Sequence, residues 1–163
     1  MKIKNLNVIS RINNLLNKVI FMSKYPLSTN RFTVNWGGNR IGVSEVIGLA
    51  LEIEPIQYTE GAFVTNGPVL MPGQQKKNTI ILKRGIIKND NDYYDWINSV
   101  KGNTIDRRDI TISLLNENKE PEITWILTNA FPIKLRWSDL NARSNEAAME
   151  TLEIVYESIR LAK

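Results

Sequence analysis

The sequence predicts a mainly β fold: an antiparallel β-sandwich or partly open barrel with one main α-helix at about residues 91–101. Three observations lead to this prediction. After Pro26, apolar and polar side chains alternate with a period of two in most segments, as in half-buried strands. Only the segment Asp90–Gly102 in that region combines helical spacing with clear start and stop signals. The length of 163 residues suits one domain that can bury a core.

Residues 1–24 differ from the rest of the chain in charge and in period. They hold five Lys or Arg and no acid, whereas residues 25–163 carry 16 basic and 17 acidic side chains. Between Ile9 and Ile20, apolar residues recur at three- and four-residue steps, which predicts an amphipathic helix. We therefore divide the chain into a basic amphipathic extension, 1–24, and a β domain, 25–163. The helix packs on its own domain or a neighbouring subunit, or lies on a membrane surface, unless Met22 is the natural start.

The first strands follow directly after the extension. Phe32–Trp36 alternates and ends at Gly37-Gly38, a pair typical of a hairpin turn. Ile41–Ile47 and Ala50–Tyr58 are the next predicted strands, the second with one face in water. Pro55 kinks the end of that strand or places it at a sheet edge.

The segment Thr59–Lys77 has little periodicity and several glycines and prolines, which predicts a long loop. It holds more apolar side chains than a solvated loop requires, so we expect another chain to cover them. These side chains are Phe63, Val64, Val69, Leu70 and Met71.

The second half of the chain predicts one helix among strands. Thr79–Lys83 is a strand, and Asp90 or Asp92 caps a helix whose apolar face includes Tyr93 and Trp96. For residues 147–158 the spacing alone favours a helix, although an alternating pattern is also present. Three more alternating segments lie between them: Arg108–Leu115, Glu122–Thr128 and Phe131–Trp137.

The residues give no support for catalysis. The chain has no His and no Cys, which excludes a Ser-His-Asp triad, an imidazole or thiolate metal site and a cysteine nucleophile. The acidic cluster Asp90, Asp92 and Asp95 is explained by helix capping, and nothing sets a separation for Glu45 and Glu60 as a glycosidase pair. We expect no catalytic residue, no metal and no cofactor.

The remaining polar and aromatic features have ordinary structural explanations. The basic pairs Lys76-Lys77 and Lys83-Arg84 fit a solvated face better than a nucleic-acid site, because the β domain is nearly neutral. Gly37-Gly38 lacks the Lys and Ser or Thr of a phosphate loop. Four tryptophans occupy apolar positions of strands or of the helix, where core or interface packing is expected. They are Trp36, Trp96, Trp125 and Trp137.

Eight segments follow one another along the chain as motifs of a single family. Tyr58–Gly61 is similar to the motif "Y-R-E-G", Thr79–Gly85 to "I-T-L-K-R-G", and Trp125–Pro132 to "W-x-L-x-N-A-F-P". The other segments are Tyr25–Val34, Val43–Leu49, Tyr94–Trp96, Arg107–Ile110 and Asn141–Glu153. Together they resemble the T4-type phage tail tube proteins, a family that includes the inner-tube proteins of contractile injection systems. The resemblance covers residues 25–160, with Thr59 standing where the family often has a basic residue.

The resemblance implies a tail-tube fold that forms hexameric rings, which stack around a channel for DNA or protein cargo. Its partners are further copies of itself, a contractile sheath protein, and baseplate, spike and terminator proteins. It implies assembly in the bacterial cytoplasm, within a phage tail or an injection particle that is extracellular or docked to a membrane. It also makes residues 147–158 a strand, which overrides the helical interpretation. The expected inter-subunit contacts are Ser44, Glu45, Tyr58, Glu60, Gly61, Phe63, Val64, Leu70 and Met71.

Two other function classes remain open from the residues. A monomeric carbohydrate- or peptide-binding β-sandwich would use exposed tryptophans as a platform. A carboxylate hydrolase would use Glu45, Glu60 or the cluster at Asp90. The phage tail and the injection particle are not distinguished by these residues.

Overall fold

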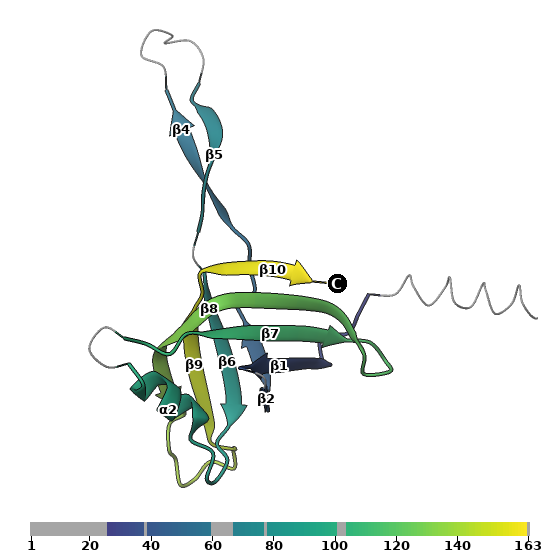
Figure 1. Ribbon diagram of the computed structural model, residues 1–163. Helices are drawn as coiled ribbons and strands as arrows, with labels where there is room; N and C mark the ends of the chain where they lie inside the picture. The colour runs from purple at the N-terminus through teal and green to yellow at the C-terminus, as the bar shows by residue number, and fades with distance from the viewer. Residues whose placement is uncertain (1–25, 38, 60–66, 77, 101–103, 163) are drawn as a thin grey trace, which may run out of the picture.

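The computed structural model describes residues 26–37, 39–59, 67–76, 78–100 and 104–162. Within these ranges the chain is built from ten antiparallel strands and one helix, as the sequence predicts (Figure 1). The helix is α2, Asp92–Asn98. The strands are β1 Phe32–Trp36, β2 Asn39–Ile41, β3 Glu45–Ile47, β4 Ile53–Tyr58, β5 Val69–Gln75, β6 Thr79–Gly85, β7 Arg108–Leu115, β8 Pro121–Trp137, β9 Met149–Val155 and β10 Ser158–Ala162.

Eight of the strands form one continuous sheet that folds over into two layers. The order is β2-β1-β7-β8-β9-β6-β3, and β10 also pairs with β8. We call β2, β1, β7, β10 and the first half of β8 the β7 layer, and the second half of β8 with β9, β6 and β3 the β6 layer. In Figure 1 β1, β7, β10 and the first half of β8 run across the view while β6 and β9 run steeply, so the layers cross over the core.

Strand β8 belongs to both layers, which corrects one prediction. The segments Glu122–Thr128 and Phe131–Trp137 are a single strand of 17 residues, not two. Asn129, with φ at +52°, bends the strand without ending it, since asparagine tolerates the left-handed region. Its amide side chain donates a hydrogen bond to Glu157 at 2.7 Å, and its backbone N–H donates to Asp109 at 3.0 Å.

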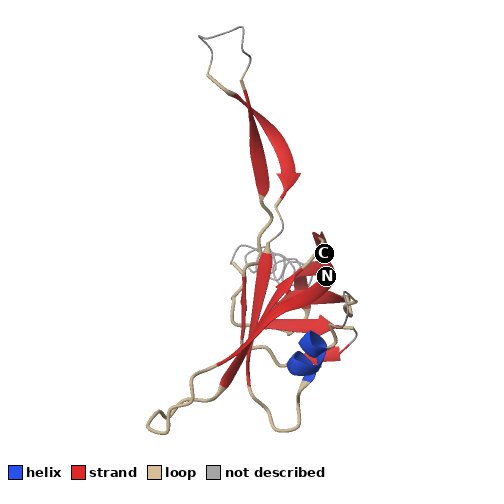
Figure 2. Ribbon diagram, turned by 90° about the vertical axis from the view of Figure 1, so that its left-hand side faces the viewer, coloured by secondary structure: helices blue, strands red, loops and turns tan. Residues whose placement is uncertain are grey.

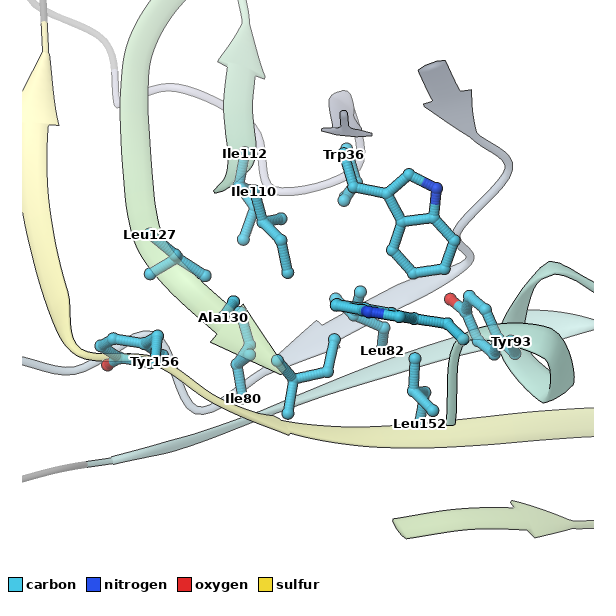
Figure 3. Packing of buried hydrophobic residues seen from close by; sticks show 13 residues of the cluster. Trp36, Ile80, Leu82, Tyr93, Ile110, Ile112, Leu127, Ala130, Leu152 and Tyr156 are labelled. Carbon is cyan, nitrogen blue, oxygen red and sulfur yellow. The ribbon is translucent and has the colours of Figure 1, made fainter. Parts of the chain in front are cut away.

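The core lies between the two layers and is closed at one end by α2 (Figure 3). Alternate residues of β6 and β9 are buried, which explains the period of two seen in the sequence. Trp36 packs against Tyr93 and Trp96 of the helix, with ring centroids 5.3 and 4.7 Å apart. The aromatic face predicted for the helix therefore meets the first strand.

Strands β4 and β5 form a separate two-stranded ribbon that projects away from both layers (Figure 2). The prediction of a loop over Thr59–Lys77 is thus wrong for Val69–Gln75. Pro72 lies opposite Pro55. Proline is tolerated at both positions because each strand of an isolated pair has a free edge, where the N–H that proline lacks is not needed for a ladder hydrogen bond. Gly73 permits close contact: a Cβ there would lie 2.1 Å from the Glu54 carbonyl oxygen.

Three other predicted boundaries change. Ile41–Ile47 divides into β2 and β3, which lie at opposite ends of the strand order, and Val43 between them packs against the core. The strand after Ala50 begins only at Ile53, and all of its residues are exposed. The last segment is extended and forms β9 and β10. The strand that the family resemblance implies is therefore confirmed, and the helix that the spacing favours is wrong.

Some predictions fall outside the described residues. These are the amphipathic helix Ile9–Ile20 and its alternative start at Met22, Gly38 of the first turn, and Lys101-Gly102 at the predicted helix end. The neighbouring Gly37, with φ at +56°, is described, and the pairing of Trp36 with Asn39 confirms the hairpin.

Gly48, between β3 and the β4–β5 ribbon, is a position where we expect alanine to be destabilising. Its φ is +91°, and a Cβ would lie 2.4 Å from the carbonyl oxygen of Thr79. We expect Gly48→Ala to lower the free energy of unfolding by about 1–3 kcal/mol, as measured by denaturant titration. Gly42→Ala is the matched control, since nothing lies within 4 Å of its Cβ position. Equal losses in both variants would contradict the steric explanation.

Candidate assembly interface

The β4–β5 ribbon carries large apolar side chains that its own domain does not cover. Ile56 pairs with Met71 and Tyr58 pairs with Val69, so these four side chains lie on one face of the ribbon. Their exposed fractions are between 41% and 59%. Leu70 lies on the opposite face and is 64% exposed. A two-stranded ribbon is marginally stable by itself, so this apolar surface is suited to burial against another protein.

The β6 layer has two strand edges with no partner within the described residues. One edge is β3, and the other is the second half of β8, whose neighbour is β9 on one side only. At the β3 edge, the backbone N–H and the hydroxyl of Ser44 both donate to the carbonyl oxygen of Lys83, at 2.8 and 3.0 Å. Lys83 Nζ in turn lies 2.7 Å from a carboxylate oxygen of Glu45. Unpaired edges of this kind are sites where a strand of another chain can add.

The predicted contact residues are therefore found on two surfaces. Ser44 and Glu45 lie at the β3 edge, while Tyr58, Leu70 and Met71 lie on the ribbon. All five are exposed. The remaining four lie outside the described residues: Glu60, Gly61, Phe63 and Val64. Sequence reasoning missed the exposed Ile56 of the ribbon and the second edge on β8, whose pairing depends on the bend at Asn129.

The prediction that Arg84 lies on a solvated face is wrong. Its side chain is 2% exposed. Nε donates to Glu150 at 2.5 Å, and the two terminal nitrogens donate to the two carboxylate oxygens of Asp90 at 2.9 and 3.0 Å. Burial works against the charged form of Arg84, but these hydrogen bonds outweigh it and raise the pKa above its ordinary value. Asp90 also accepts a hydrogen bond from the Asp92 N–H at 3.2 Å. The N-cap residue of α2 is Asn91, so the prediction of Asp90 or Asp92 at that position is wrong.

Tyr93 completes this buried cluster. The guanidinium carbon of Arg84 lies 4.0 Å from the centre of its ring. Burial raises the pKa of the Tyr93 hydroxyl, and the nearby positive charge of Arg84 opposes that shift. The hydroxyl has no hydrogen-bond partner among the described residues. Both carboxylates of this cluster, Asp90 and Glu150, are therefore held by the guanidinium of Arg84.

Within the described residues, which do not include Glu60, the other candidate chemistries are not assembled. Glu45 is engaged with Lys83, and Asp90 with Arg84. No cluster of side chains suited to a metal ion occurs in the described part of the chain. Trp36 and Trp96 are buried, Trp125 is half-buried against the core, and Trp137 is 51% exposed, so they form no common platform. Of the helices that the structure describes, none is long and apolar enough to span a membrane.

Comparison with known proteins gives consistent results. The family model described as T4-like virus tail tube protein gp19 matches residues 28–160. The chain is similar to a chain of the sheath-tube complex of PVC, an extracellular contractile injection system, in its extended state. That match has 32% identity and a TM-score of 0.78, and covers 85% of this chain and 93% of the other.

Two further cryo-EM structures hold similar chains. One is the tube-terminating cap of the anti-feeding prophage, with 32% identity, a TM-score of 0.80, and coverage of 86% of this chain and 93% of that one. The other is the six-fold symmetrised baseplate of the anti-feeding prophage, with 26% identity, a TM-score of 0.76, and coverage of 85% and 97%. A comparison with curated proteins gave no match.

Proposed function

Because the chain belongs to the family of T4-like virus tail tube proteins and is a tube protein of the contractile-injection type, we propose that six copies of it close into a ring and that such rings stack into the inner tube of a contractile particle. Three related chains, from a sheath-tube complex, a tube-terminating cap and a six-fold symmetrised baseplate, support this assembly.

The observation that carries the proposal is the even number of strands in the β6 layer. Its four strands run antiparallel in the order β8, β9, β6, β3, so the two edge strands point in opposite directions. Rotation about a ring axis preserves strand direction, and β3 of one copy therefore meets β8 of the next as an antiparallel partner. A head-to-tail contact of this kind closes into a ring when its rotation permits, and closure removes both edges.

The β4–β5 ribbon supplies the second contact. Its apolar face, with Tyr58 and Met71, and its opposite face, with Leu70, extend beyond the layers that would form the ring wall (Figure 2). We place this ribbon against an adjacent subunit or the adjacent ring, where its apolar side chains are covered.

The partners follow from this role. The tube lies within a contractile sheath, begins at a baseplate and spike, and ends at a terminator, and its channel passes DNA or protein cargo without sequence-specific recognition. The particle assembles in the bacterial cytoplasm. Its work is mechanical, so the protein is not an enzyme and needs no cofactor. The basic residues 1–24 precede the matched segment, and we treat them as an extension of the tube domain.

Cross-linking tests the ring directly, because the native chain has no cysteine. In the variant Ile47→Cys/Lys134→Cys, one thiol lies on each edge strand. Within one subunit the two thiols are three strand spacings apart, about 14 Å. A bismaleimide whose span is shorter than this distance can therefore link only thiols of different subunits. We expect a ladder that ends at six copies on a denaturing gel, and six-fold rings or tubes by electron microscopy.

Ile47→Cys alone is the control, and it should give no ladder. A species that stays monomeric at high concentration, and that adds to no ring even with its sheath and baseplate partners, would instead favour the binding-module alternative. A ladder that continues past six without closing would contradict the ring.

A further inference from the structure

One row of side chains crosses the β6 layer from edge to edge. The paired positions run from Glu45 on β3 to Lys83 on β6, then to Thr151 on β9 and Arg136 on β8. Their neighbours along β6 and β9, such as Leu82 and Leu152, point into the core. The row therefore lies on the face of the layer that the rest of the domain does not cover.

The charges of this open face are matched except at one edge. Lys83 pairs with Glu45 at 2.7 Å, and Lys134 pairs with Glu153 at 2.9 Å. Arg136 is exposed and forms no ion pair within the described residues. A carboxylate thus stands at one end of the row, and an arginine without an ionic partner stands at the other.

In the proposed ring, the open face lines the channel. Six copies of a four-stranded layer give about 24 strands, and at about 4.8 Å per strand the wall has a radius of roughly 18 Å, somewhat more when the strands tilt. A domain of this length has a radius of gyration of about 15 Å, so six of them do not fit inside that wall. The β7 layer and α2 must lie outside it, with the open face inward.

We propose that Glu45 of one subunit forms an ion pair with Arg136 of the neighbouring subunit, on the channel side of the seam where β3 meets β8. This inference rests on the proposed ring. Directly opposite or diagonal positions on paired strands lie within reach of a side chain as long as arginine. Glu45 then faces Lys83 on its own subunit and Arg136 across the seam. The pair makes the two edges electrostatically complementary and selects the correct neighbour and register.

Charge reversal tests the pair. The experiment compares the full-length protein with Glu45→Arg, Arg136→Glu and the double reversal, by counting rings in electron micrographs over a series of protein concentrations. We expect each single reversal to weaken association about tenfold per seam, since attraction is replaced by repulsion. The double reversal is made in a Lys83→Gln background, where the new arginine at position 45 meets no cation of its own subunit, and it should recover ring formation to within about threefold. The loss of association in each single-reversal variant should become smaller at high salt, because these side chains are exposed.

A further variant separates the seam from the subunit. Lys83→Gln removes the partner of Glu45 within its own chain and leaves the seam pair, so it should assemble like the native protein. Single reversals that assemble normally, or a double reversal that stays defective while its circular dichroism and melting temperature are native, would overturn the ion pair. Native protein that forms no rings would overturn the proposed function itself, which is a distinguishable outcome.

Discussion

Replacing Tyr58 and Met71 with serine is expected to abolish tube formation while the subunit stays folded. Both side chains lie on the apolar face of the β4–β5 ribbon, and neither contributes to the core cluster. Their exposed fractions are 52% and 41%. Burying the exposed half of such a side chain is worth about 1–2 kcal/mol, so losing two at each contact weakens it by roughly 30- to 700-fold.

The measurement is electron microscopy of purified protein together with its thermal melting curve. Gln57→Ser/Gln74→Ser is the matched control, since it changes two exposed polar residues of the same strands, and it should assemble normally. A large fall in melting temperature with tubes still present would assign Tyr58 and Met71 to the stability of the subunit instead of to its assembly.

The largest loss of stability is expected for Arg84→Met. The substitution leaves Glu150, which is 6% exposed, without its ionic partner inside the protein, and removes both hydrogen bonds to Asp90. Breaking a buried ion pair on one side costs about 3–5 kcal/mol, because the remaining charge is uncompensated. Domains of this size are stable by only about 5–15 kcal/mol, so denaturant titration should show a large shift of the unfolding midpoint.

A second substitution shows whether the unpaired charge is the cause. In Arg84→Met/Glu150→Met two apolar side chains replace the pair, and such replacements are often close to neutral, so much of the lost stability should return. Arg107→Met, which breaks the exposed pair with Glu157, is the control and should cost at most about 1 kcal/mol. A double variant no more stable than Arg84→Met would point to lost packing instead.

The same buried pair explains why the sequence misleads at the C-terminal strand. From Glu150 to Tyr156 every second side chain is buried, but the first position of that series holds a carboxylate. A charged residue at a core position hides the period of two, and the spacing of Ala148, Leu152 and Val155 then resembles a helix. The strand can be recognised only when Glu150 is considered together with its partner Arg84, which lies 66 positions away in the chain.

The alternating strands with apolar core positions, the first hairpin and the aromatic helix could be predicted from local pattern alone. Strand β5 of the ribbon could not, because Pro72 and Gly73 are typical turn residues and their place in β5 depends on the free edges of an isolated pair. The candidate interface was only partly predictable, because the pairing of its strands is likewise not visible in the local sequence. Apolar residues such as Leu70 can be identified in the sequence, whereas the role that we propose for Arg136 depends on its register with Thr151 and Glu45 in the folded sheet.

The continuity of β8 has a mechanical consequence for a tube that lies inside a contractile sheath. In the proposed assembly its first half lies in the outer layer and its second half in the channel wall, joined at Asn129 by unbroken backbone. A load applied to the outside of a ring therefore reaches the wall through covalent bonds. The hydrogen bonds of β8 to β7, β10 and β9 share that load in shear, so the two layers advance as one body.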